Sequence, residues 1–225
     1  MDLPADLNAA RRQCVAALEA ALADGLTRLQ VDLRFEGLRW PAVAHGLSQG
    51  LQQRGAIVLA FADMGAAALA RRDFGLSAAE ALTFADLGRG RCADHAALCI
   101  AVTPAASDFT AFENACTALG ECPIIALNPR LEDAAVGIGS VARARRRGLL
   151  ALWRVVYGLY PLERAALAYA HPGPWRLFQE DADGFRLVAS LPNRPDRSDM
   201  DQLLGQSRPG RGLAKAADDL LQQMG

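Results

Sequence analysis

Short, continuous apolar runs alternate with helical patterns over the first two thirds of the chain. Residues 124–127 (Ile-Ile-Ala-Leu) are apolar at every position, so both faces of a strand there must be covered, as in the middle of a parallel sheet. Residues 56–61 and 96–102 have the same pattern. Pro129 lacks the N–H that a central strand needs, so the last strand should end near Asn128. We therefore predict that these three runs form adjacent, buried, parallel strands.

Each of the three runs is followed by a segment with helical periodicity, which indicates right-handed strand–helix–strand crossovers. Residues 29–35 instead alternate between apolar and polar, which predicts a strand with one solvated face near a sheet edge. Ser77 and Glu80 have the spacing of a capping box, which predicts a further short helix after them. Pro4 and the apolar spacing behind it predict a helix within residues 1–25.

The pattern changes after Pro161. Residues 165–169, 175–180 and 185–190 read as short strands joined by tight, turn-rich links, which is typical of an antiparallel meander. The predicted fold class is therefore α/β, with a mostly parallel central sheet flanked by helices and an antiparallel C-terminal meander. We expect a single α/β domain over residues 1–204, with its antiparallel portion at 161–191. Residues 205–225 are expected to form a linker and a weak C-terminal helix.

An arginine-rich helix is predicted between the parallel and antiparallel parts. Ser140 can cap its start. Its apolar stripe comprises Val141, Leu149, Leu152, Val155 and Val156, and its first two turns carry Arg143, Arg145, Arg146 and Arg147. Cations at a helix N-terminus oppose the macrodipole, typically by ~0.3–1 kcal/mol each when exposed. We therefore expect a counter-anion nearby, from the protein or from a partner.

Composition narrows the function classes. The chain has 225 residues, of which 52% are hydrophobic, so it can bury a substantial core without disulfides or metals. Its net charge of −1 argues against general nucleic-acid binding. The five cysteines include no C-x-x-C pair, the N-terminus lacks a signal-peptide pattern, and no apolar run approaches the ~20 residues of a membrane span. These features predict a protein of a reduced, cytoplasmic compartment.

Polar residues follow the predicted parallel strands at the edge where such sheets usually bind ligands. With the glycine loop and the arginine helix they form a predicted ligand- or partner-binding rim: Asp63, Gly65, Arg71, Arg72, Thr103, Asn128, Arg130, Gly137, Gly139, Ser140, Arg143 and Arg146. The alternative interpretation is purely structural. In that case Asp63 with Glu132 or Asp133 would neutralise the arginines, while Asn128 and Thr103 would make turn hydrogen bonds.

No catalytic residue, metal site or cofactor is predicted. Gly137-Ile138-Gly139-Ser140-Val141-Ala142 matches G-x-G-x-x-A, but nine residues separate it from the strand that a dinucleotide fingerprint should follow directly, and no acidic residue lies about twenty residues later. The chain contains no phosphate-binding P-loop motif and no G-x-S-x-G nucleophile elbow. Residues 92–95 (Cys-Ala-Asp-His) resemble half of a zinc site without a second half.

Four segments of the chain stand out together. They are residues 61–73 with Phe61-Ala62-Asp63-Met64-Gly65 at their start, Asn128-Pro129-Arg130-Leu131, Val136-Gly137-Ile138-Gly139 with the arginine helix, and Pro172-Gly173-Pro174-Trp175. In this order they resemble a domain-of-unknown-function family of cyanobacteria and chloroplasts. The resemblance covers roughly residues 28–204. The family includes the low photosystem II accumulation protein, a stromal assembly factor, and a chloroplast adenylate kinase that carries the domain as an extension. The resemblance implies a role in photosystem assembly and a location in the cytoplasm or at the thylakoid periphery, and it supplies no catalytic residues.

Two hypotheses of function follow. In the first, the chain is a soluble, non-enzymatic binding or assembly factor that docks an acidic protein partner on the basic rim. In the second, the same rim binds a nucleotide or another phosphorylated small molecule. The lack of a nucleophile, a metal cluster or an acid–base pair favours the first hypothesis. A dry, enclosed pocket at the strand ends would favour the second.

Overall fold

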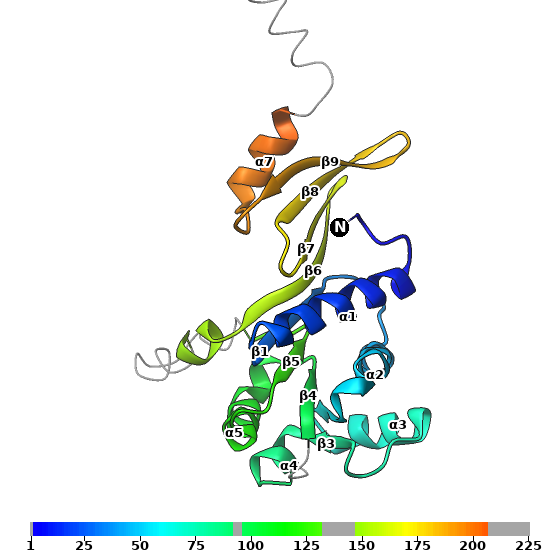
Figure 1. The fold of residues 1–225 in the computed structure, drawn as a ribbon, viewed down its shortest axis with the longest axis vertical. Helices are drawn as coiled ribbons and strands as arrows, with labels where there is room; N and C mark the ends of the chain where they lie inside the picture. The colour runs from blue at the N-terminus through cyan, green and yellow to red at the C-terminus, as the bar shows by residue number, and fades with distance from the viewer. Residues whose placement is uncertain (1, 92–95, 132–146, 207–225) are drawn as a thin grey trace, which may run out of the picture.

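The computed structural model describes residues 2–91, 96–131 and 147–206, and within them one sheet runs through the molecule (Figure 1). Its strands lie in the order β3-β2-β4-β5-β1-β6-β7-β8-β9. Their bounds are β1 Arg28–Leu33, β2 Ala56–Phe61, β3 Ala81–Thr83, β4 Ala96–Val102, β5 Ile124–Leu127, β6 Arg154–Leu162, β7 Ala165–Ala170, β8 Trp175–Asp181 and β9 Gly184–Leu191. Strands from β3 to β6 pair in parallel, whereas β6 to β9 pair antiparallel.

The prediction for the three apolar runs is confirmed. Strands β2, β4 and β5 are adjacent and parallel, with Leu59 opposite Ile100 and Ile100 opposite Ile125. Every residue of β5 is buried, because helices cover both faces of this part of the sheet. The predicted α/β class and the antiparallel C-terminal meander are confirmed as well.

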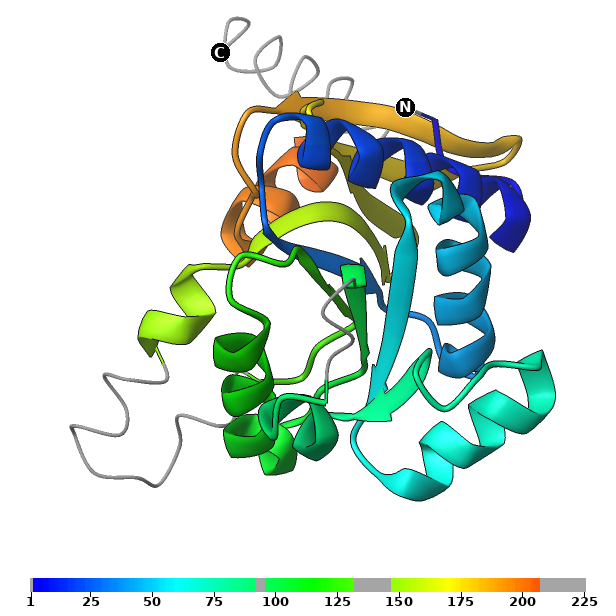
Figure 2. The ribbon, with the colours of Figure 1, turned by 60° about the horizontal axis from the view of Figure 1, so that its bottom comes forward.

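Two layers of helices enclose the parallel strands, as Figure 2 shows. The helices are α1 Leu7–Ala23, α2 Trp40–Gly50, α3 Met64–Phe74, α4 Phe84–Gly88, α5 Phe109–Leu119 and α7 Arg197–Gln206, with 3-10 turns η1 Gln52–Arg54 and η2 Ala106–Asp108 and helical residues 147–151. One face of the sheet packs against α1, α2 and α3. The other packs against α4, α5 and residues 149–150, while α7 covers the meander.

The prediction that β1 lies near a sheet edge is wrong. Strand β1 lies between β5 and β6, in the interior of the sheet. The alternation in its sequence does not reflect a solvated face, because Asp32 is 1% exposed. This carboxylate is instead satisfied inside the protein, by hydrogen bonds from the side chains of Tyr160, Gln30 and Arg34.

The short helix predicted directly after Ser77 and Glu80 is a strand. The two residues do bond reciprocally, since the Ser77 N–H donates to the Glu80 carboxylate and the Glu80 N–H donates to the Ser77 hydroxyl. These bonds close a turn, after which residues 81–83 extend and pair with β2. The helix begins only at α4, where Thr83 and Asp86 form a true capping box.

The predicted arginine-rich helix ends earlier than its apolar stripe suggested. Residues 147–151 are helical, but Val155 and Val156 belong to β6, where β-branched residues pack well. Strand β6 pairs in parallel with β1 and antiparallel with β7, so the antiparallel portion begins before residue 161. The start of that helix, and the C-terminal helix predicted after residue 206, lie outside the described residues.

Candidate functional site

The strand connections create a change of direction between β1 and β5. The chain leaves β1 toward α2 on one face of the sheet, whereas after β5 it reaches residues 149–150 on the opposite face. In open α/β sheets ligands bind outside the carboxyl ends of strands at such a switch point. The carboxyl ends of β1 and β5 are therefore the place where the sheet geometry favours a binding site.

The buried carboxylate of Asp32 lies at the carboxyl end of β1. Asp32 accepts hydrogen bonds from the Tyr160 hydroxyl at 2.6 Å, from Nε2 of Gln30 at 3.0 Å and from Nη2 of Arg34 at 3.1 Å. A buried charge is costly unless it is paired and hydrogen-bonded, so these three donors together allow the carboxylate to stay in the interior. The side chain of Arg34 is 28% exposed and so links this interior group to the surface.

Tyr160 joins the carboxylate to the meander. A Cβ atom on Gly158 would lie 2.5 Å from Cε2 of Tyr160, so the glycine gives the ring its room beside the strand. Burial, and then the charge of Asp32, raise the pKa of the Tyr160 phenol well above its usual range, which keeps the phenol a hydrogen-bond donor. The Arg194 guanidinium lies 4.5 Å from the centre of the Tyr160 ring and 5.3 Å from that of Trp175.

The backbone is strained where β4 and β5 end. Thr103 has φ of 46° and Asn128 has φ of 48°, both in the left-handed region. Such a conformation is tolerated by asparagine and is less usual for β-branched threonine. The Thr103 N–H donates to the Leu127 carbonyl and so links the end of β4 to β5, while the Asn128 N–H donates to the Val31 carbonyl and so links the end of β5 to β1. Strain of this kind costs roughly 1–3 kcal/mol per residue and clusters at functional sites.

Asn128 is 1% exposed, and its Oδ1 atom has no hydrogen-bond donor within the part of the chain that the structure describes. Beyond it, the Arg34 guanidinium donates to the Pro129 carbonyl at 3.3 Å, and the Arg130 N–H donates to the Pro104 carbonyl at 2.8 Å. The loops after β1, β4 and β5 are thus tied together. We call Asp32, Arg34, Thr103, Asn128, Arg130, Tyr160 and Arg194 the carboxyl-edge site.

The site has more positive than negative charge. Asp32 pairs with Arg34. Arg130 and Arg194 are exposed, and neither forms an ion pair with another described residue. The nearest cavity, lined by Gln30, Pro129 and Trp153 among others, has a volume of only about 20 Å³, close to the space of one water molecule. Among the described residues the site is therefore a charged surface and not an enclosed pocket.

The structure brings together only part of the predicted rim. Thr103, Asn128 and Arg130 lie at the strand ends as predicted. Asp63 follows β2 at the same edge, where its side chain accepts from the Ala66 N–H and caps α3, and Gly65 lies in the first turn of that helix. Asp63 therefore has a structural role and forms no ion pair with a described arginine.

Arg71 and Arg72 lie away from the carboxyl ends of the strands. They are in the last turn of α3, about 10 Å along the helix from its first residue at 1.5 Å rise per residue. Nε of Arg71 donates to the Ala81 carbonyl at 3.1 Å, and Arg72 pairs with Asp73 at 2.9 Å. Gly137, Gly139, Ser140, Arg143 and Arg146, which were also predicted for the rim, lie outside the described residues.

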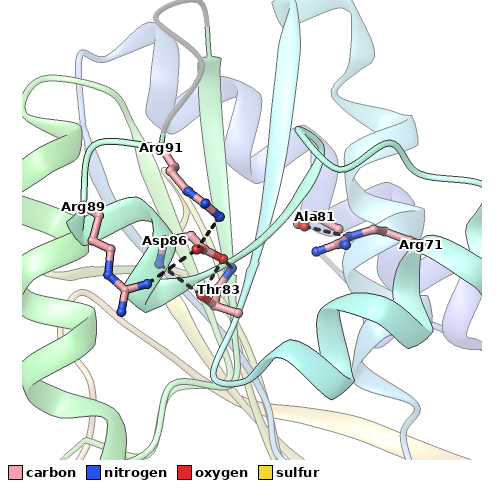
Figure 3. A network of polar contacts seen from close by, with 6 residues as sticks. All are labelled: Arg71, Ala81, Thr83, Asp86, Arg89 and Arg91. Carbon is pink, nitrogen blue, oxygen red and sulfur yellow. Dashed lines mark hydrogen bonds and ion pairs between the residues drawn. The ribbon is translucent and has the colours of Figure 1, made fainter.

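Two further arginines, Arg89 and Arg91, face one carboxylate away from this site. Figure 3 shows the Asp86 carboxylate beside Thr83 and facing both Arg89 and Arg91. The Thr83 hydroxyl donates to Asp86 at 2.8 Å, and Nη1 of Arg91 lies 3.1 Å from the same carboxylate. These contacts, with the Thr83 hydroxyl bond the largest, lower the pKa of Asp86. Arg89 and Arg91 thus share the one carboxylate of Asp86, which ties both side chains to α4.

Sequence reasoning missed Asp32, Arg34, Tyr160 and Arg194. The acidic residue Asp32 was a signal for the first of them, but the alternation of apolar and polar residues in this segment was interpreted as a solvated face. No group of three or more potential metal ligands occurs among the residues described. Within the same ranges no helix has the length and apolar character needed to cross a bilayer.

Comparison with known proteins identifies a family and goes no further. The model of the family described as "Domain of unknown function (DUF1995)" matches residues 4–202. No curated protein and no solved structure matches the chain.

Proposed function

Because the chain belongs to the DUF1995 family, which is defined without a known function, we propose its function from the carboxyl-edge site. The chain is a non-enzymatic binding protein that docks an acidic segment of a protein partner on this site. The observation that carries the proposal is that the carboxyl-edge site, whose backbone is strained at Thr103 and Asn128, includes two exposed arginines, Arg130 and Arg194. Neither is balanced by a described carboxylate.

Rigidity is what makes the edge suitable for recognition. Side chains on strand ends hold a more constant position than side chains on free loops, so less conformational entropy is lost when a partner binds. Arg34 adds to this, because its contacts with Asp32 and the Pro129 carbonyl fix two of the three loops relative to each other. Guanidinium groups suit carboxylate recognition, since they can donate two parallel hydrogen bonds.

A phosphorylated small molecule is the second candidate for the same site. The cavity beside the site is about 20 Å³, whereas small-molecule pockets usually enclose about 300–1,000 Å³. An open, charged surface favours a partner protein over a buried ligand. Assistance in photosystem II assembly, which the resemblance to the cyanobacterial and chloroplast family implies, would be one instance of this function, at the thylakoid periphery.

The test is a titration with defined probes. A fluorescein-labelled poly-glutamate peptide serves as the acidic partner, and inorganic phosphate and ATP serve as the alternative ligands. Binding to the peptide is measured by anisotropy for the wild type, for the double variant Arg130→Gln/Arg194→Gln, and for Arg72→Gln/Arg89→Gln as a control of equal charge change. The control arginines are exposed and already paired with Asp73 and Asp86.

We expect the wild type and the control variant to bind the peptide with an affinity that falls steeply as salt rises. The affinity of the Arg130→Gln/Arg194→Gln variant for the peptide should be about tenfold lower or more, since two charge-assisted contacts disappear. An equal loss of peptide affinity in the site variant and in the control variant would show non-specific attraction to net charge and would contradict the proposal. Tight binding of phosphate or ATP without peptide binding would select the second candidate.

A further inference from the structure

A cleft opens at the same end of β1 as the carboxyl-edge site, but on the opposite face of the sheet. It has a volume of about 340 Å³ and lies between α1, α2 and the loop that joins β1 to α2. Its floor is formed by Leu33, Cys14 and Leu47, all of which are buried. Leu7, the first residue of α1, also lines the cleft and is 51% exposed.

The charged groups of the cleft all have one sign. Its lining includes Arg11 and Arg39 and no acidic residue. Arg11 lies along α2, since a Cβ atom on Gly46 would meet its Cδ atom at 3.0 Å and its Nη1 atom at 3.1 Å, so this side chain also borders a neighbouring hollow that Gly46 lines. Arg11 forms no ion pair with another described residue. Arg39 reaches Asp73 at 3.5 Å, but its side chain is 78% exposed, so this contact is weak and easily exchanged.

The geometry points to a site for a single-chain anionic amphiphile, that is, an alkyl chain with a carboxylate or phosphate head. The apolar floor would take the chain, and the head would lie between Arg11 and Arg39. A volume of about 340 Å³ corresponds to roughly eleven groups of the size of a water molecule, so a chain of about ten carbons fits. The N-terminus of α2, which begins at Trp40 without a side-chain cap, adds a further partial positive charge at the head.

The inference is independent of the proposed function. Leu33 points into the cleft between α1 and α2, while its neighbours Asp32 and Arg34 belong to the hydrogen-bond cluster of the carboxyl-edge site. Variants of the cleft therefore leave the carboxyl-edge site unchanged. The protein can therefore bind an amphiphile without binding an acidic peptide, or bind an acidic peptide without binding an amphiphile, and the two results are distinguishable.

The probes are decanoate, decyl phosphate, decanol and decyltrimethylammonium, titrated below their micelle concentrations and followed by calorimetry. We expect saturable binding of the two anions with one site per chain, and at least about tenfold weaker binding of the cation and of the neutral alcohol. Arg11→Gln should weaken decanoate binding about tenfold. Arg12→Gln is the matched control, because Arg12 is the next residue on α1, is exposed and does not line the cleft.

A second variant tests the apolar floor. Ala42→Leu places a larger side chain on the half-buried lining of the cleft and should abolish binding of decanoate while its thermal midpoint stays near that of the wild type. If Ala42→Leu does not fold, the comparison of decanoate affinity between Arg11→Gln and Arg12→Gln decides whether the inference holds. Absence of saturable decanoate binding, or equal affinity in Arg11→Gln and Arg12→Gln, overturns the inference. Binding to vesicles of anionic lipid without binding of decanoate would also overturn it, because the surface would then recognise a bilayer and not a single chain.

Discussion

Replacing Tyr160 with phenylalanine tests the buried cluster at the heart of the carboxyl-edge site. The change keeps the ring, which is 9% exposed and packs against Trp175 at a centroid distance of 6.0 Å, and removes only the hydroxyl. Asp32 then loses its shortest hydrogen bond while Gln30 and Arg34 still donate. The chain supplies a matched control in the same strand, Tyr157→Phe, since the Tyr157 hydroxyl bonds the neutral Gln13 side chain at 3.0 Å.

The magnitudes differ because the partners differ. A hydrogen bond to a charged group contributes about 1.5–3 kcal/mol, whereas a neutral one contributes about 0.5–1.5 kcal/mol. Tyr160→Phe should therefore lower the free energy of unfolding by about 2 kcal/mol, and Tyr157→Phe by about 1 kcal/mol. In a domain of this size each kcal/mol lowers the thermal midpoint by about 2–4 °C, so the expected shifts are about 4–8 °C and about 2–4 °C.

Urea unfolding at pH 7, followed by tryptophan fluorescence and by circular dichroism, measures both variants with the wild type. The m-values should agree among the three proteins, so that differences in midpoint report stability. A double-mutant cycle with Asp32→Asn then isolates the coupling of the phenol with the carboxylate. Equal destabilisation by Tyr160→Phe and Tyr157→Phe, or no coupling in the cycle, would refute the view that the phenol stabilises a buried carboxylate.

Three further predictions concern single positions and pH. Gly158→Ala should destabilise the fold by about 1–3 kcal/mol in urea unfolding, because its Cβ atom would displace the Tyr160 ring; stability equal to wild type would contradict this. Asp86→Asn should cost about 1 kcal/mol at pH 7, because the Asp86 carboxylate is the N3 member of the α4 capping box and accepts the Thr83 hydroxyl. Since the pKa of Asp86 is lowered in the folded protein, that contribution is present above its unfolded pKa of 3.8 and is lost as pH falls further, so the unfolding curves of variant and wild type should converge in acid. At the alkaline end, burial raises the pKa values of Tyr157 and Tyr160 above their usual range and that of Cys116 to about 12. Stability measured against pH should therefore fall as pH rises above about 9, and Tyr160→Phe should flatten the fall above about pH 10.

The parallel core could be predicted from the sequence because its signal is local. The run at 124–127 is apolar on both faces, and only a strand covered on both sides satisfies that pattern. The same holds for the short strands of the meander, whose tight turns fix their antiparallel pairing. Local composition was sufficient to predict these strands and how they pair.

The position of β1 could not be predicted, because it depends on groups far away in the chain. From the sequence alone Asp32 is interpreted as solvated, because the hydroxyl that donates to it belongs to Tyr160, 128 residues later. The same limit applies to the carboxyl-edge site. Thr103, Asn128 and Arg130 follow strands and could be found by that rule, whereas Arg194 approaches only because the meander folds back and places its guanidinium over the Tyr160 ring.

Residue-by-residue mapping of the acidic-peptide contact shows whether the carboxyl-edge site is the docking surface. Backbone amide NMR shifts of the labelled protein are recorded while poly-glutamate is added at low salt. We expect the largest shifts on the ends of β1, β4 and β5 and on the loop that carries Arg194, and we expect them to vanish in Arg130→Gln/Arg194→Gln. Shifts confined to α1, α2 or α3, or a wild type that shows none at all, would contradict it.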